Sequence, residues 1–237
     1  MKTKRILGTT VGLATVALLA AFSAQASITY TSTGSDSDGS LDGTAQFTFG
    51  AGYVTIVLDN LVTGSQLSQG QAVSGVTFNV AGVTSSSTFG QTFSGNAVDL
   101  VGNGTTTPVP ADDSLPNWLV NPTAGNIELA VTGVIGSGGK PEDMIIPGGT
   151  TYVPGIDSHN PYALGSATFT LTSSLFTTST TISDVDILFG TSPDAVLAAQ
   201  PPTPPSVPEP TTVFAGAMLL LPFGIGAIRA LRKDRQA

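Results

Sequence analysis

Residues 43–60 read GTAQFTFGAGYVTIVLDN, and this stretch decides the fold. Apolar side chains occupy every second position of residues 45–49 and again of residues 54–58, with mainly polar residues between them. A period of two is typical of a strand with one buried face. The glycines of Gly50-Ala51-Gly52 allow a sharp reversal, so the stretch predicts two antiparallel strands joined by a three-residue loop.

The same alternation returns in four further segments, and no long 3.6-residue apolar stripe interrupts them. The segments are residues 76–80, 127–132, 167–171 and 184–189. In the last of them we expect Val185, Ile187 and Phe189 on one face and Asp184, Asp186 and Leu188 on the other. We therefore predict an all-β fold, an antiparallel β-sandwich formed as a single domain by residues 27–200. A β-solenoid is the alternative, but the sequence has no repeat of fixed period.

The charge balance of this body excludes several functions. Between residues 27 and 206 one base, Lys140, stands against fourteen acids, which gives a net charge of −13. A surface with one Lys and no Arg cannot neutralise a phosphate backbone, so nucleic-acid binding is excluded. The chain has no Cys and one His, which excludes disulfides, thiolate metal sites and multi-histidine zinc sites. We expect no cofactor.

The N-terminus has the three parts of a secretory signal peptide. The bases of its first part are Lys2, Lys4 and Arg5. An apolar run follows over residues 6–22, and Ala24 and Ala26 provide the small residues that a signal peptidase reads. We predict a signal peptide over residues 1–26, handled by the general secretion machinery and cut after Ala26. The alternative is a membrane helix that stays uncut.

The C-terminus carries a second hydrophobic signal. Residues 201–210 read PPTPPSVPEP, with six prolines in ten, and predict an extended linker. Residues 211–228 hold no charge over 18 positions, about 27 Å of helix, and predict a single transmembrane helix. Residues 229–237 form a basic tail whose cations are Arg229, Arg232, Lys233 and Arg235. The positive-inside rule places this tail in the cytoplasm and the body outside.

The order of these parts resembles a known sorting signal. Pro208-Glu209-Pro210, then a short hydrophobic helix, then a basic end together resemble the PEP-CTERM signal over residues 207–235. The resemblance implies recognition of this motif by an exosortase, a membrane transpeptidase of Gram-negative bacteria, and removal of the tail at or near it. It implies that the helix and the basic cluster hold the chain transiently in the inner membrane, and it suggests a host that makes extracellular polysaccharide. The alternative is a plain anchor that is never cut.

The body is similar, more loosely, to β-rich bodies carried by PEP-CTERM surface proteins. The stretches that carry this similarity are residues 43–60, 68–82 and 181–194. It implies no activity.

Motifs for catalysis are few. No G-x-S-x-G occurs, and GVIGSGGKP at residues 133–141 lacks the first glycine and the Ser or Thr of a phosphate loop. His159 could serve a catalytic triad, but its DSHNPY context is typical of a turn. Asp112-Asp113 and Glu142-Asp143 lie in Pro- and Gly-rich loops, where we expect solvated acids.

Two further groups of acids remain candidates. Asp184 and Asp186 share a strand face about 6.6 Å apart, which a glycosidase could use, although a solvent-facing row is the simpler interpretation. Asp36, Asp38 and Asp42 in GSDSDGSLDG offer oxygen ligands that Ca²⁺ prefers, yet the spacing is not that of an EF-hand loop. A solvated turn is the favoured interpretation there.

Together these patterns predict a non-enzymatic, exported protein of the cell surface, the extracellular matrix or the medium, associated with exopolysaccharide or biofilm. The first alternative is a carbohydrate- or calcium-binding adhesive module, which a concave aromatic patch of Trp118, Tyr152 and Tyr162 would favour. The second is a secreted hydrolase, which two buried carboxylates in one cleft would favour.

Overall fold

The computed structural model describes residues 27–202, apart from Ser65, Asn103, residues 133–139, Thr150 and residues 193–194. The predicted signal peptide over residues 1–26 and the predicted sorting signal over residues 207–235, with its helix at residues 211–228, lie outside the described residues. Within residues 27–202, no helix has the length and apolarity needed to cross a membrane.

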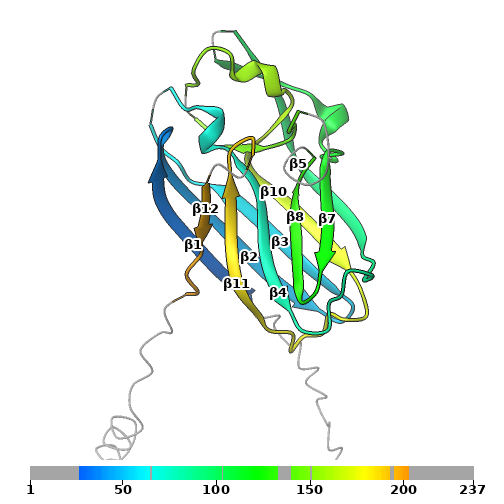
Figure 1. Ribbon diagram of the computed structural model, residues 1–237. Coiled ribbons are helices and arrows are strands. Elements are labelled where there is room, and N and C mark those ends of the chain that lie inside the picture. The colour runs from blue at the N-terminus through cyan, green and yellow to red at the C-terminus, as the bar shows by residue number, and fades with distance from the viewer. Residues whose placement is uncertain are drawn as a thin grey trace, which may run out of the picture.

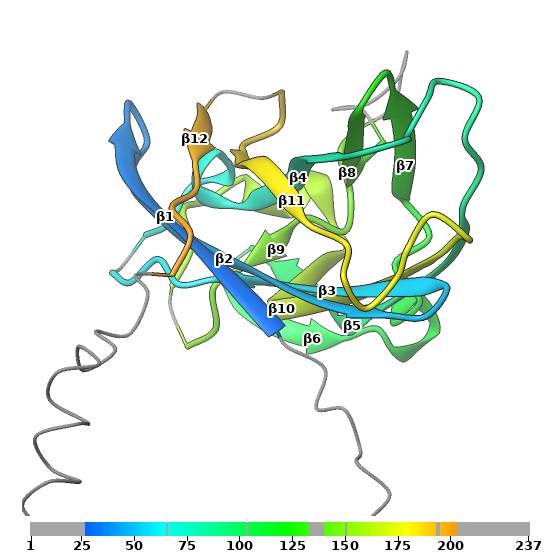
Figure 2. The ribbon, with the colours of Figure 1, turned by 90° about the horizontal axis from the view of Figure 1, so that it is seen from below.

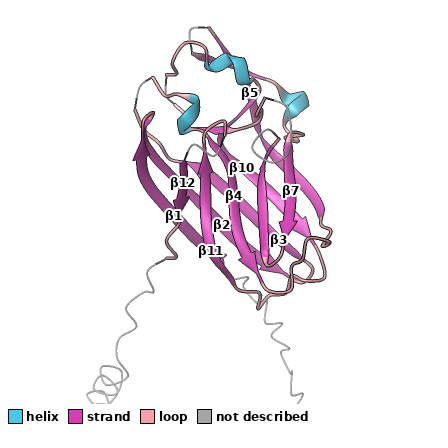
Figure 3. Cartoon of the chain, viewed as in Figure 1, coloured by secondary structure: helices cyan, strands magenta, loops and turns pink. Residues whose placement is uncertain are grey.

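The described chain is all-β, as predicted, with three short 3-10 helices (Figure 3). Its strands are β1 (Ser27–Asp36), β2 (Gly39–Gly50), β3 (Tyr53–Asn60), β4 (Val73–Val80), β5 (Gly90–Val101), β6 (Thr105–Pro108), β7 (Trp118–Thr123), β8 (Asn126–Val131), β9 (Ile145–Ile146), β10 (Tyr162–Thr172), β11 (Ile182–Phe189) and β12 (Ala195–Ala198). The 3-10 helices are η1 (Gln69–Gln71), η2 (Pro110–Asp112) and η3 (Ile156–His159).

The strands form one hydrogen-bonded sheet of mixed direction. Its order is β1-β2-β3-β10-β9-β4-β11-β12, with β5 and β6 branching from β10, and β8 and β7 from β4. In Figures 1 and 2 the strands lie in two facing layers, with β1, β2, β3, β10 and β5 in one and β12, β11, β4, β8 and β7 in the other. The expectation of a purely antiparallel sheet is wrong at one place, because β9 runs parallel to β10 through Ile145–Ala163 and Ile146–Leu164.

The opening hairpin is confirmed with a shorter loop. Every second residue of β2 and β3 is buried, and the two strands pair without a break from Gly43 to Gly50. Gly50 pairs with Tyr53, so the loop consists of Ala51 and Gly52 and not of three residues. Gly52 alone takes the positive φ, +86°, that reverses the chain, so Gly50 stays in the strand.

The predicted apolar faces meet between the layers. Phe47 of β2 and Phe78 of β4 contact edge to face, with ring centroids 5.0 Å apart, and both side chains are fully buried. Aromatic pairs of this geometry add about 0.5–1.5 kcal/mol to the burial of their area. The core is therefore built by the residues whose period of two predicted the strands.

One residue of β11, Leu188, is buried although the sequence pattern predicts that it is exposed. Leu188 was expected outside, yet it is only 3% exposed. The pairing of β11 with β4 is irregular between Ser183 and Asp186 and again between Leu188 and Phe189. Leu188 lies over Gly75 of β4, where an added Cβ would be 2.8 Å from its Cδ1. The missing side chain of Gly75 provides the space that buries Leu188.

Candidate functional site

The two ends of the described body are joined to each other. The Thr31 amide of β1 donates to the Gln200 carbonyl at 3.0 Å, and the Gln200 amide donates back to the Thr31 carbonyl at 2.8 Å. One residue earlier, the Ala199 amide donates to the Val185 carbonyl of β11 at 2.7 Å. The segment that follows β12 therefore bridges β11 and β1 and closes the path of the sheet. No local pattern at Gln200 predicted this contact.

β1 begins and β12 ends toward the same side of the body, the lower end in Figure 1. We call this the tail end and the opposite one the far end. The tail end consists of the connections at residues 51–52, 81–89, 124–125 and 173–181. The predicted cleavage motif at residues 208–210 and the predicted basic cluster at residues 229–235 lie outside the described residues, and so do Ala24 and Ala26.

The three aromatic residues that would form a sugar-binding patch are buried. Trp118 is 1% exposed, Tyr152 6% and Tyr162 0%. Trp118 packs against Phe169 with ring centroids 4.4 Å apart, while the hydroxyls of Tyr152 and Tyr162 donate to backbone carbonyls at 2.6 and 2.7 Å. Burial, with a smaller contribution from Asp157, raises the pKa of Tyr162. These rings are core residues and present no face to a sugar.

Asp143 occupies an unexpected place, because it is the only buried acid among the residues described. Its amide donates to the Pro161 carbonyl at 2.7 Å, and its carbonyl accepts from Trp118 Nε1 at 2.9 Å. Its Oδ2 accepts the backbone amide and the side-chain amide of Asn117, both at 3.0 Å. Its Oδ1 is buried without a hydrogen-bond partner. Asp143 thus joins three segments of the far end.

The expectation that Glu142 and Asp143 are both solvated acids is therefore wrong for Asp143. Burial raises the pKa of its carboxyl, the bonds from Asn117 partly lower it, and the charges of Asp112 and Glu142 raise it further. Glu142 is only half-buried. The described residues thus do not offer the two buried carboxylates in one cleft that would favour a hydrolase.

The other loop acids have structural partners. Asp113 is half-buried and its Oδ1 accepts the Ala97 amide at 2.9 Å, so it fixes its loop to β5 and is not simply solvated. His159 ends η3, and its Nδ1 lies 3.0 Å from the Pro141 carbonyl. These contacts are typical of turn residues. The partner of His159 Nδ1 is a backbone carbonyl, whereas a catalytic triad would place a carboxylate there.

Asp184 and Asp186 line one open groove of about 460 Å³ together with Tyr30 and Gln200. Asp184 is exposed, and its Oδ2 accepts from Asn79 Nδ2 at 2.7 Å and from a neighbouring serine hydroxyl at 3.0 Å. Asp186 is half-buried. Neither side chain is buried. This placement favours the simpler interpretation of Asp184 and Asp186, a row of acids that faces solvent, over a glycosidase pair.

The three acids of the calcium hypothesis are spread along the β1–β2 hairpin. Asp36 Oδ1 accepts the amides of Asp38 and Gly39 at 2.9 and 3.2 Å, which fixes the turn. Asp42 pairs with Thr33, three register steps away from the Asp36–Gly39 pair. Among the described residues, no three His, Cys, Asp or Glu side chains converge on a position for a metal ion. The placement favours the solvated turn.

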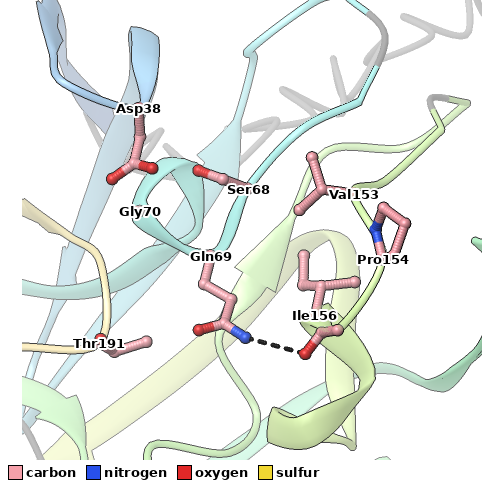
Figure 4. Close-up of a pocket in the computed structure, with 9 residues that line it drawn as sticks. Asp38, Ser68, Gln69, Gly70, Val153, Pro154, Ile156 and Thr191 are labelled. Atoms are coloured by element: carbon pink, nitrogen blue, oxygen red, sulfur yellow. Dashed lines mark hydrogen bonds between the residues drawn. The ribbon is translucent and has the colours of Figure 1, made fainter.

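A hollow of about 330 Å³ lies at the far end. Figure 4 shows its lining, where Asp38 approaches Gly70. Gln69 lies across it, and its Nε2 donates to the Gly155 carbonyl at 3.3 Å and to the Ser158 hydroxyl at 3.2 Å. Asp38 is the one carboxylate in its lining, which contains no aromatic ring. The hollow therefore lacks both a carboxylate pair and a surface for stacking a sugar.

Comparisons of this chain with protein-family models, with characterised proteins and with solved structures found no match.

Proposed function

We propose that this chain is an exported, non-enzymatic protein of the cell surface or extracellular matrix, sorted and cut by an exosortase. The observation that carries the proposal is the order of three sequence features at one terminus: Pro208-Glu209-Pro210, 18 uncharged residues, and four bases before the end of the chain. The N-terminal signal is consistent with it, because it sends the body to the side on which the proline motif would be cut.

The placement of the body's ends supports this route. The closing segment ends at Gln200, and the motif begins eight residues later, so a cut at the motif leaves every contact of Ala199 and Gln200 in the product. Ser27, the first residue after the predicted signal peptide, pairs with Thr48 as the first residue of β1. Both proposed cuts therefore fall outside the folded sheet.

The proposed class of the body is a β-sandwich whose two layers are joined through β9. This interpretation rests on the two facing layers and on core contacts between them, such as Phe47 with Phe78.

The proposed partners of the protein during export are the signal peptidase, the secretion machinery and the exosortase. At its final address outside the inner membrane, the proposed partner is extracellular polysaccharide.

The experiment is a measurement of intact mass and of the C-terminal peptide on protein recovered from its native host. We expect a new C-terminus between Ser206 and Thr211, with Ser27 as the first residue. A chain that ends at Ala237 and stays in the inner membrane would contradict the proposal. A tethered periplasmic binding role would then replace it.

A further inference from the structure

The tail end of the body is built around two connections with the same hydrogen bonds. Residues 84–87 read TSSS and residues 177–180 read TTST. In the first, the Thr84 amide donates to the Ser87 hydroxyl at 2.9 Å, and the Ser87 amide donates to the Thr84 carbonyl at 2.9 Å. In the second, the Thr177 amide donates to the Thr180 hydroxyl at 2.8 Å, and the Thr180 amide returns to Thr177 at 3.0 Å.

These turns are held side by side and not as separate loops. Phe89, after the first turn, stacks on Phe176, before the second, with ring centroids 5.7 Å apart. The Gly52 amide of the β2–β3 hairpin donates to the Phe176 carbonyl at 2.9 Å, and Gly125 of the β7–β8 hairpin bonds to the residues before the first turn. The four connections thus form one rigid surface rich in hydroxyls.

Charge is divided between the two ends of the body. The connections of the tail end, residues 51–52, 81–89, 124–125 and 173–181, contain no Asp, Glu, Lys, Arg or His. In the connections of the far end, the described charged residues are Lys140 and the acids Asp38, Asp112, Asp113, Glu142, Asp143 and Asp157. The acids nearest to the tail end are Glu128, Asp184 and Asp186, within strands β8 and β11.

The distance between the two ends of the body is several times the Debye length, the distance over which salt screens a charge. β10 spans the body with 11 residues, about 36 Å at 3.3 Å each, while the Debye length at physiological salt is about 8 Å. On the proposed function, residues 203–210 separate the body from the membrane helix, and eight residues of extended chain reach at most about 25 Å. The body is therefore kept close to the bilayer, with its uncharged end nearest.

We infer that the tail end, centred on the turns at residues 84–87 and 177–180, lies against the phospholipid headgroup surface while the chain is tethered. This inference rests on the proposed function. The partner is a membrane surface that carries anionic headgroups. Such a membrane would repel the acidic far end if that end approached it. It would not repel the tail end, whose connections carry neutral hydroxyl groups and no charge. The orientation holds the linker after Pro202 at the membrane, where a membrane-embedded enzyme could reach it.

The chain has no cysteine, so single labels can be introduced without background. The test uses residues 27–237 in vesicles of phosphatidylcholine with phosphatidylglycerol, with one fluorophore at Ser85→Cys or Thr178→Cys. Both residues are exposed. The matched far-end labels are Ser37→Cys and Thr63→Cys, which are also exposed. A quencher on the lipid headgroups reports proximity to the surface.

We expect several-fold stronger quenching at Ser85 and Thr178 than at Ser37 and Thr63, and loss of the difference when a protease releases the body from the vesicles. Equal quenching at both ends of a vesicle-bound chain would overturn this inference alone. A chain that does not float with the vesicles would overturn the proposed membrane helix and this inference with it.

A second measurement uses the native host. Ser85→Asp with Thr178→Asp should slow removal of the tail two- to ten-fold, because the added charge is repelled by the membrane. Ser37→Asp with Thr63→Asp should leave the rate unchanged. Equal rates for the two acidic pairs would contradict the inference, whereas an unprocessed parent chain would contradict the proposed function.

Discussion

Thr31 and Gln200 stand 169 positions apart in the chain and exchange two backbone hydrogen bonds, at 3.0 and 2.8 Å. This exchange joins the first strand of the sheet to the residues that follow its last strand. The folded unit therefore includes the chain as far as Gln200, at the edge of the proline-rich linker.

The first prediction concerns the closing bonds. Gln200→Pro removes the amide that donates to Thr31 and should lower the free energy of unfolding by about 0.5–1.5 kcal/mol, the net contribution of one backbone hydrogen bond between these exposed residues. Urea unfolding of the body, residues 27–202, measures the change. Gln200→Ala is the control, because it keeps both backbone bonds, and it should be near neutral. Similar losses in both variants would mean that the side chain, and not the backbone exchange, matters.

The second prediction concerns the length of the folded unit. A chain ending at Pro202 should unfold at the same urea concentration as a chain ending at Thr211. A chain ending at Thr191 loses the pairing of β12 with β11 and the exchange with Thr31, and should be less stable by several kcal/mol. Circular dichroism and urea titration of the three chains provide the comparison. Equal stability of the shortest chain would show that the closing segment contributes nothing.

The third prediction concerns pH and Asp143. Burial raises its pKa in the folded chain above the ordinary value of 3.8, so the folded state binds this proton more tightly than the unfolded state. The stability gained from the proton is present at pH below 3.8 and is lost as the pH rises through the folded pKa. Asp143→Asn should remove this loss, because the amide stays neutral and still offers an oxygen to Asn117.

The measurement is the free energy of unfolding between pH 3 and 7, compared between parent and variant. Asp38→Asn, at an exposed position, is the control and should leave the difference in place. A parallel pH dependence in the parent and in Asp143→Asn would rule out Asp143 as its source.

The fourth prediction concerns Gly75. A Cβ at this position would lie 2.5 Å from the Ala130 Cβ and 2.8 Å from Leu188 Cδ1. Gly75→Ala should therefore destabilise the body by about 1–3 kcal/mol through overpacking, measured by thermal unfolding. Gly148→Ala, where an added Cβ meets nothing within 4 Å, is the matched control and should be near neutral. A neutral Gly75→Ala would mean that Leu188 can move without cost.

The fifth prediction uses Trp118, the only tryptophan of the chain. Its fluorescence should be blue-shifted and poorly quenched by iodide in the folded body, because the ring is buried against Phe169. Trp118→Phe keeps most of the apolar area but loses the bond to the Asp143 carbonyl, at a cost of about 1–3 kcal/mol. A change in Trp118 fluorescence on addition of oligosaccharide would contradict the assignment of this residue to the core.

The sequence predicted those strands whose two faces differ in polarity. β3 is the clearest case, since Val54, Ile56 and Leu58 alternate with residues that are only half-buried. β1 was missed, because SITYTSTGSD places few apolar side chains at alternate positions and its contribution is mainly backbone pairing with β2. Leu188 was misplaced because two irregularities in the register of β11 and the small size of Gly75 decide its burial.

The buried acid could not have been found from its neighbours in sequence. Asp143 follows a proline and an acid in a glycine-rich stretch, which is typical of a solvated loop. Its burial depends on Asn117 and Pro161, which the fold brings from other segments. The terminal signals, in contrast, are linear patterns that depend on order and composition, so they could be read without a fold.

The closing segment also determines how the body would carry a mechanical load. β12 runs toward the tail end, so a pull on the chain beyond Pro202 acts along the strand axis. Antiparallel hydrogen bonds lie perpendicular to their strands, and such a pull therefore loads the bonds to β11 and to Thr31 together, in shear, instead of opening them one after another. A body held by its C-terminus in flowing water would resist extension through this short segment first.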